Sequence, residues 1–412
     1  MFTTLIETYA LSRFPGWNVP FRNVGWEGDK IRFAGIRATT ADQAIRRDIQ
    51  SLHPQVALAN YGLNDAAGGD ASYDQFLVGV NVLARDLPRV GVYRSVFISP
   101  TPKEGYDGSS PAGSPDNLML LKYAAGMKER FPIGWQNGVD FMTLHPKGTE
   151  VPLAQNGVFI DATGPMIALI EAGRKAGVLS PDDSLGDKTA RLTLDGVHLN
   201  WSGHLVLAAL ILQGIQAPDL VSSATLNGAD RTTTAAQGCT ITWQDAPAGA
   251  IQFERKDEAL PWPIPPEADL ALKLPGFDPA TTLNRYELKV TGLTGASYRL
   301  TIDGEEIGVY AQAELAQGIN LGFMRRGPIY AQGQKLLQAV EAKNDAFFNR
   351  WRTVQIGGAP APGTSADDLA AHAAEVKAEL PKLDQAIAGQ EAVIHGLCQP
   401  VAHVFRLEPV GP

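Results

Sequence analysis

An apolar run from Leu205 to Leu212 places the strongest constraint on how this chain folds. Asn200 or Ser202, just ahead of the run, can cap a helix, because their side-chain oxygens accept its unpaired backbone N–H groups. Gly214 and Pro218 then end that helix. A helix that is apolar on all sides belongs in a protein core. The residues before it are therefore anchored on a rigid element.

The loop that leads into this helix carries a carboxylate and an imidazole, Asp195 and His198. Such a carboxylate can hold one ring N–H, fix the tautomer and stabilise the imidazolium, while the other nitrogen acts as a general base. Asp195 could equally be a loop carboxylate that caps the helix, and short motifs of this kind also occur by chance. The pair alone leaves a catalytic and a structural interpretation open.

Short apolar strands alternate with helical segments over residues 1–220. Strands are predicted at 19–24, 56–60, 95–99, 139–144 and 158–161, and helices at 3–14, 40–51, 74–87, 115–130 and 165–176. This alternation predicts a parallel sheet covered on both faces. Ligand sites in such sheets lie beyond the C-terminal ends of the strands. Gly28, Asn64 and the loop of Asp195 and His198 are expected to meet at that edge.

The pattern changes after residue 220, where two-residue alternation with Gly and Pro predicts a small β-rich domain over 221–312. A hairpin is expected around Asp303 and Gly304. Residues 313–356 are expected to form a helical segment that packs back on the α/β domain. The remainder, 357–412, is predicted to be a linker followed by C-terminal helices, one capped by Ser365 and a second beginning at Pro381.

Composition excludes several function classes. The chain has 412 residues and a formal charge of −9 with no Lys/Arg run, which argues against nucleic acid as the main partner. No apolar run reaches the roughly 18 residues of a membrane-spanning helix. Cys239 and Cys398 lack CxxC spacing, which excludes a Cys-rich zinc site and leaves their pairing open. Neither a metal nor a cofactor is expected.

Three short blocks resemble the SGNH (GDSL-type) serine hydrolase family. Trp26-Glu-Gly28-Asp29 resembles its glycine block, Gly62-Leu-Asn64-Asp65 its Gly-x-Asn-Asp block, and Asp195-Gly-Val-His198 its Asp-x-x-His block. Their order and approximate spacing fit the family. The resemblance covers about residues 1–220, and the stretch 348–352 is similar to extensions found in some large bacterial members.

The resemblance implies a flavodoxin-like three-layer parallel sheet and hydrolysis of an ester through acyl transfer to water. His198 would be the base and Asp195 its orienting carboxylate. The Gly28 backbone N–H and the Asn64 side-chain amide would form the oxyanion hole, where one donor is commonly worth roughly 3–4 kcal/mol of barrier. Gly28 could also serve only a turn, and Asn64 a turn or cap. His204 is predicted to be structural.

The family's Gly-Asp-Ser block is missing, and no Gly-x-Ser-x-Gly elbow replaces it. In the family, the first strand and the nucleophilic serine lie just ahead of the helix with which this sequence begins. Thr3 and Thr4 are better explained as helix residues, so the nucleophile is unknown. We expect the sequence to be an N-terminal truncation with little activity, a prediction that the DNA read in frame ahead of Met1 would test. Localisation stays open for the same reason.

Two alternatives to a serine esterase remain. One is a non-catalytic module that keeps the cleft to bind an acylated glycan or another acyl ligand. The other is a metal-assisted hydrolase using Asp195, His198 and His204, which is disfavoured because six residues, not four, separate the two histidines. The expected ligand is a small ester or an acylated glycan, and the shared machinery does not identify it further.

Overall fold

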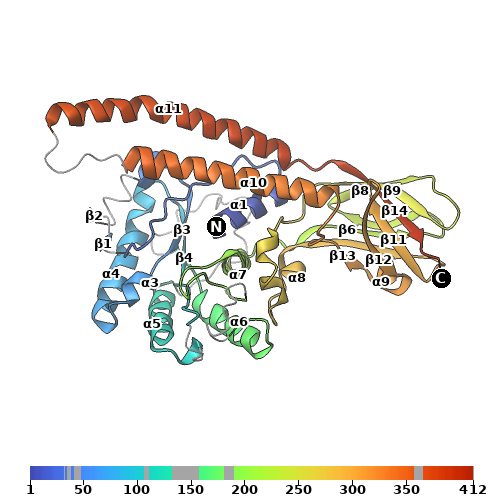
Figure 1. Cartoon of the computed structure of the whole chain (residues 1–412), viewed down its shortest axis with the longest axis horizontal. Coiled ribbons are helices and arrows are strands. Elements are labelled where there is room, and N and C mark those ends of the chain that lie inside the picture. Colours follow the sequence, from blue (N-terminus) through green and yellow to red (C-terminus); the bar gives the residue numbers. More distant parts are fainter. Residues whose placement is uncertain are drawn as a thin grey trace.

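The computed structural model describes residues 1–31, 33–34, 39–40, 48–105, 111–131, 157–180, 190–356 and 365–411. Its α/β part and its β-rich part lie at opposite ends of an elongated molecule, as Figure 1 shows. Two long helices, α10 (Pro328–Phe348) and α11 (Ala366–Leu397), run side by side over the α/β part. The predicted α/β class is confirmed.

A three-stranded parallel sheet forms the centre of the α/β part. Its order is β3 (Val56–Asn60), β4 (Arg94–Ile98) and β5 (Gly157–Ile160), close to the predicted strands. Every residue of β4 is buried, as expected for a parallel strand covered on both faces. The helices of this part are α1 (Phe2–Arg13), α3 (Leu63–Ala66), α4 (Asp70–Asp86), α5 (Pro115–Arg130), α6 (Thr163–Lys175) and α7 (Trp201–Gly214).

The strand predicted at 19–24 is wrong, because residues 14–31 contain no strand. A strand needs a hydrogen-bonded neighbour, and no described strand pairs with this segment. The helix predicted at 40–51 lies largely outside the described residues, although Gln50–Leu52 forms a 3-10 turn. The strand predicted at 139–144 and the linker at 357–363 lie wholly outside them.

Two sheets build the β-rich part, ordered β13-β10-β6-β7 and β12-β11-β14-β9-β8. Their strands are β6 (Leu220–Asn227), β7 (Thr232–Gln237), β8 (Cys239–Gln244), β9 (Ile251–Asp257), β10 (Arg285–Thr291), β11 (Ser297–Ile302), β12 (Glu305–Ala311), β13 (Ile319–Asn320) and β14 (Ala402–Pro409). Strands β11 and β12 form the predicted hairpin, which turns at Asp303 and Gly304. Helices α8 (Pro279–Leu283) and α9 (Gln312–Gln317) lie between these strands in the sequence.

The sequence predicts only a linker and helices over 357–412, but this region also contains a strand, β14. Strand β14 pairs with β9 and β11 in the middle of the five-stranded sheet. Its buried residues, His403, Phe405 and Leu407, alternate with more exposed ones. This two-residue period is the pattern of a strand with one buried face, so the signal was present in the sequence.

A buried polar network joins α10 to α1. Lys343 Nζ lies 2.7 Å from Glu7 Oε1, and both side chains are almost fully buried. The Asn344 amide donates to Thr4 Oγ1 at 3.2 Å and to Glu7 Oε2 at 3.1 Å. Asn344, which interrupts the apolar stripe of this helix in the sequence, therefore helps to hold α1 in place. Removing one partner of a buried ion pair typically costs about 3–5 kcal/mol.

The helix break predicted at Pro381 is wrong, because α11 continues through it to Leu397. Proline removes one backbone hydrogen bond, but the helix is held from outside, since Ile387 packs with Phe347 and Trp351. The Ser365 hydroxyl caps the start as predicted, accepting from Asp368 N at 3.1 Å.

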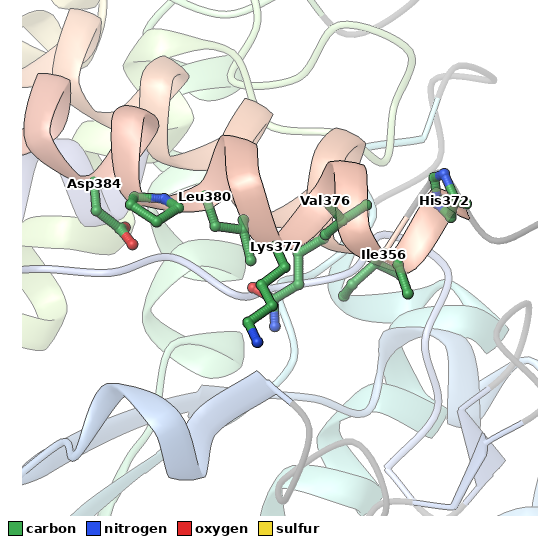
Figure 2. A pocket seen from close by; sticks show the side chains of 9 residues that line it. Ile356, His372, Val376, Lys377, Leu380 and Asp384 are labelled. Carbon is green, nitrogen blue, oxygen red and sulfur yellow. The ribbon is translucent and has the colours of Figure 1, made fainter. Parts of the chain in front are cut away.

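A groove of about 440 Å³ lies between α11 and the residues Gln355 and Ile356. Figure 2 shows Val376, Lys377 and Leu380 of the helix on one side of it and Ile356 beneath. None of the four site residues predicted from the sequence lines this groove.

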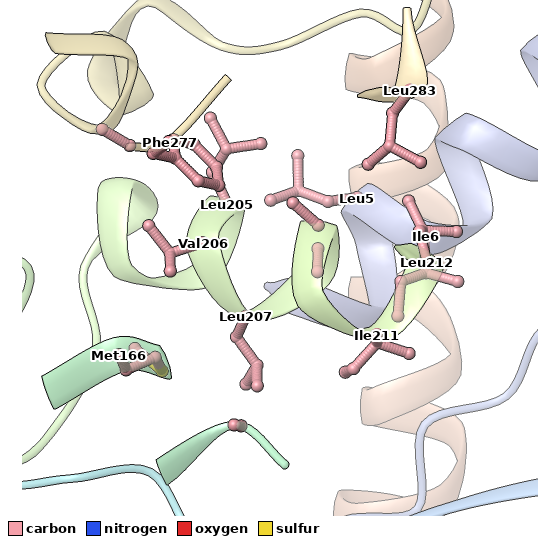
Figure 3. Packing of buried hydrophobic residues seen from close by; sticks show 14 of the residues in the cluster. Leu5, Ile6, Met166, Leu205, Val206, Leu207, Ile211, Leu212, Phe277 and Leu283 are labelled. Atoms are coloured by element: carbon pink, nitrogen blue, oxygen red, sulfur yellow. The ribbon is translucent and has the colours of Figure 1, made fainter. Parts of the chain in front are cut away.

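Helix α7 lies in the core, as its apolar composition predicts. Leu205, Leu207 and Ile211 are essentially inaccessible to solvent. Leu5 and Ile6 of α1 pack on the same cluster, visible in Figure 3. Each fully buried side chain of this kind contributes about 1.5–3 kcal/mol to the stability of the fold. The loop that leads into α7 is therefore attached to a rigid element.

Candidate active site

The loop that carries Asp195 and His198 is closed on itself and docked on α7. Leu194 N donates to His198 O at 2.7 Å, and Asn200 N donates to Leu192 O at 3.0 Å. Asn200 also caps α7, because its Oδ1 accepts from Gly203 N at 3.1 Å. A Cβ atom on Gly203 would lie 2.1 Å from Leu192 O, so only glycine allows the loop to approach so closely.

A buried carboxylate holds this loop from below. Glu104, 1% exposed, accepts from Leu192 N at 3.1 Å, and from Thr193 N and Oγ1 at 3.0 and 2.5 Å. Its own backbone N donates to Gly196 O at 2.8 Å. Burial raises the pKa of the Glu104 carboxyl. Glu104 could not be predicted from the sequence, because nothing in the residues around it indicates a contact with a loop far along the chain.

Asp195 both shapes the loop and contacts the imidazole of His198. Its Oδ1 accepts from Val197 N at 3.0 Å and from His198 N at 2.8 Å, which shapes the turn. Its Oδ2 lies 2.5 Å from His198 Nδ1. The hydrogen bonds from His198 lower the pKa of Asp195 to about 2, and the bond to Asp195 raises the pKa of His198. The imidazole is thereby oriented, with its Nε2 directed away from Asp195.

A second carboxylate, which the sequence analysis also missed, contacts the other ring nitrogen. Glu27 Oε1 lies 2.9 Å from His198 Nε2, and the two side chains are 77% and 52% exposed. Glu27 directly precedes Gly28, whose φ of 81° lies in the region that favours glycine. Within the described part of the chain, no partner accepts a hydrogen bond from the Gly28 N–H.

Asn64 reaches the same segment from the carboxyl end of β3. Its Nδ2 donates to Asp29 O at 3.3 Å. The neighbouring Asp65 is buried and accepts from Ile31 N at 3.2 Å, and burial raises its pKa to about 6. Helix α3 therefore holds the segment that contains Gly28.

Three of the four predicted residues are associated with the tripeptide Glu27-Gly28-Asp29, and Asp195 is linked to it through His198. His198 contacts its first residue and Asn64 its last. Residues two apart in the chain have Cα atoms no more than about 7 Å from each other. The imidazole and the amide therefore contact one short segment of the chain, from two distant parts of the sequence.

No nucleophile is found among the described contacts of His198, where no serine or threonine hydroxyl is a partner. Thr3 Oγ1 instead accepts from Asn23 at 3.4 Å, and the Thr4 hydroxyl belongs to the network with α10. His204 stacks on Phe2 with ring centroids 6.1 Å apart, and burial lowers its pKa to about 3.

The described ranges contain no group of three His, Cys, Asp or Glu side chains that could hold a metal ion. Cys239 and Cys398 are both free and buried. None of the helices described here is long and apolar enough to cross a membrane.

Comparison with known proteins reveals a likeness in fold to a solved structure. No family model matches the sequence, and no curated protein matches it. A solved structure described as a gut microbial diltiazem-metabolizing enzyme is similar with a TM-score of 0.73 and 20% identity. The match covers 99% of this chain and 94% of that one, so the two share an overall fold.

Proposed function

We propose that this protein is an SGNH-type ester hydrolase acting on acyl or acetyl esters of a small molecule or glycan. One observation carries the proposal: His198 and Asn64 reach the same tripeptide from two distant segments. A general base and oxyanion donors must flank a single reacting carbonyl, and this arrangement supplies both kinds of group. The enzymatic description of the structural neighbour is compatible with this function.

In the proposed reaction, Asp195 keeps the proton on His198 Nδ1, and His198 Nε2 accepts the proton of the attacking nucleophile. The Gly28 N–H and the Asn64 amide donate hydrogen bonds to the carbonyl oxygen as negative charge develops on it. Asn64 must first exchange its bond to the Asp29 carbonyl for one to the substrate. The proposal assigns the nucleophile to a serine of the Gly-Asp-Ser type, which the sequence of this chain does not include.

Glu27 must release His198 before catalysis, because its carboxylate occupies the nitrogen that would act as base. The contact is half exposed, and exposed ion pairs are worth only about 0–1 kcal/mol. Substrate binding can therefore displace it at little cost.

The proposal is tested by hydrolysis of p-nitrophenyl acetate. The assay compares the chain with the same chain extended by any residues encoded in frame ahead of Met1. We expect hydrolysis in the extended protein that depends on His198. Equal rates in both proteins would contradict a missing serine, and no His198-dependent hydrolysis in either would contradict an esterase.

A second candidate is a non-catalytic module that binds an acylated glycan or related acyl ligand. The occupied Nε2 of His198 favours it, together with the lack of a hydroxyl partner among the described contacts. Binding of an acetylated sugar without turnover in the extended protein would support this candidate.

A further inference from the structure

The segment Asn349–Ile356 follows α10 as a π-helical turn and packs against the loop that precedes Gly28. Trp351, which is 1% exposed, meets the edge of Trp26 with ring centroids 5.8 Å apart. Arg352 extends over the face of the same indole, with Cζ 3.2 Å from the ring centroid. Irregular π-turns of this kind are frequent at functional sites.

The guanidinium of Arg352 has no ionic partner among the residues that the structure describes. It instead contacts the Trp26 ring and, at 5.7 Å, the Phe348 ring. The carboxylates of Glu27 and Asp195 are both already bonded to His198. Stacking on an aromatic face holds the planar guanidinium while leaving its edge N–H groups available for hydrogen bonds.

Arg352 is linked to the candidate site through Trp26. It contacts Trp26, and the next residue, Glu27, contacts His198. Cα atoms of consecutive residues are about 3.8 Å apart. A group bound to the Arg352 edge would therefore lie beside the segment Trp26–Glu27, whose second residue contacts His198.

We propose that Arg352 is a substrate-binding residue that recognises a carboxylate on the ester. The substrate class is then an ester with an anionic group near the scissile bond, an inference that rests on the proposed hydrolase function. Two parallel N–H groups of the guanidinium match the two oxygens of a carboxylate, and such charge-assisted pairs are about twice as strong as neutral hydrogen bonds.

The neighbouring Arg350 provides a matched control. It belongs to the same segment, but its Nε and Nη2 bind Asp384 of α11 at 2.8 and 3.1 Å. Its charge is therefore already neutralised by a bidentate pair. Arg350→Gln removes the same kind of side chain without removing a free guanidinium.

The test measures binding by ligand-observed NMR titration with monomethyl succinate, which carries a carboxylate, and dimethyl succinate, which does not. We expect the unmodified protein to prefer the anionic ester by about 10-fold or more. Arg352→Gln should abolish the preference, Arg352→Lys should retain part of it, and Arg350→Gln should retain it fully. A purely structural Arg352 would weaken both ligands equally.

The proposal is overturned if the unmodified protein shows no preference, if Arg352→Gln keeps it, or if Arg350→Gln loses it to the same extent. Failure of the hydrolase function is seen separately, as absent turnover of p-nitrophenyl acetate. If the preference depends on Arg352 but no turnover is seen, the carboxylate proposal stands and the protein is a binding module.

Discussion

Asp195 and His198 before α7, and Asp303 and His403 in the β-rich part, make the same contact in different surroundings. The carboxylate oxygen lies 2.5 Å from Nδ1 in the first pair and 2.7 Å in the second. The His198 side chain is 52% exposed and its Nε2 meets Glu27, whereas the His403 side chain is 7% exposed and its Nε2 has no partner in the described residues.

The second pair fastens a turn to a strand. Asp303 Oδ1 accepts from Val404 N at 2.7 Å, and Asp303 N donates to Val404 O at 2.8 Å. No oxyanion donors approach His403 in the described contacts. An Asp–His contact alone therefore does not define an active site. The His198 pair differs from the His403 pair in being half exposed and in contacting the same tripeptide as Asn64.

Replacing each histidine should give the largest difference between the two regions. In the protein form that hydrolyses p-nitrophenyl acetate, His198→Asn should lower kcat/KM by roughly 100- to 10,000-fold, because general-base catalysis is lost. His403→Asn should change kcat/KM by less than about 3-fold, since it lies outside the proposed chemistry. Steady-state kinetics of both variants measures the contrast. Similar losses for both would remove the distinction.

Asn64→Ala should have the next largest effect on the first region. Loss of one oxyanion donor should reduce kcat by roughly 100- to 1,000-fold while KM changes little. Asn60→Ala serves as a control from the same strand end, because the Asn60 amide donates instead to Ser99 O at 2.8 Å. An unchanged kcat in Asn64→Ala would show that this amide does not contact the oxyanion.

Asp303→Ala should expose the structural function of the second region. It leaves Val404 N and His403 without their acceptor, and we expect the free energy of unfolding to fall by about 1–3 kcal/mol. Asp303→Asn keeps an acceptor and tolerates the φ of 49°, so it should lose less. Urea unfolding midpoints give the order. Equal stability of both variants and the unmodified protein would contradict a structural function of the contacts that Asp303 makes with His403 and Val404.

The smallest effect concerns protonation of His198. Because Asp195, and to a lesser extent Glu27, raise its pKa, the bonds to His198 stabilise the fold fully below about pH 6.5 and lose that effect as pH rises through the folded pKa. Asp195, with its pKa lowered to about 2, loses its contribution only as pH falls from about 3.8 toward that value.

The two carboxylates can be separated by NMR titration of the His198 ring. Glu27→Gln should lower the pKa of His198, and Asp195→Asn should lower it further. In turnover, Glu27→Gln should move the acidic limb of kcat/KM to lower pH, since the base must be neutral. A larger shift from Glu27→Gln than from Asp195→Asn would reverse this order of influence.

Sequence alone was sufficient where the determining interactions are local. The apolar run predicted the core helix α7 and two candidate caps, Asn200 and Ser202, of which the structure uses Asn200. Asp195 and His198 are three residues apart, so one turn can bring their side chains together. The parallel strands β3, β4 and β5 followed from short apolar runs between helices. The flavodoxin-like family fold, the domain boundaries and the catalytic roles stay predictions.

Tertiary structure decided the contacts that join distant segments. Asp303 and His403 are 100 residues apart, and Glu104 reaches a loop 89 residues away. Glu27, Arg352 and the buried pair of Glu7 and Lys343 carry no local pattern that reveals their partners. Side-chain spacing in sequence encodes which residues share a helical turn or a strand face, whereas long-range pairing depends on how whole elements pack, which no short stretch of sequence specifies.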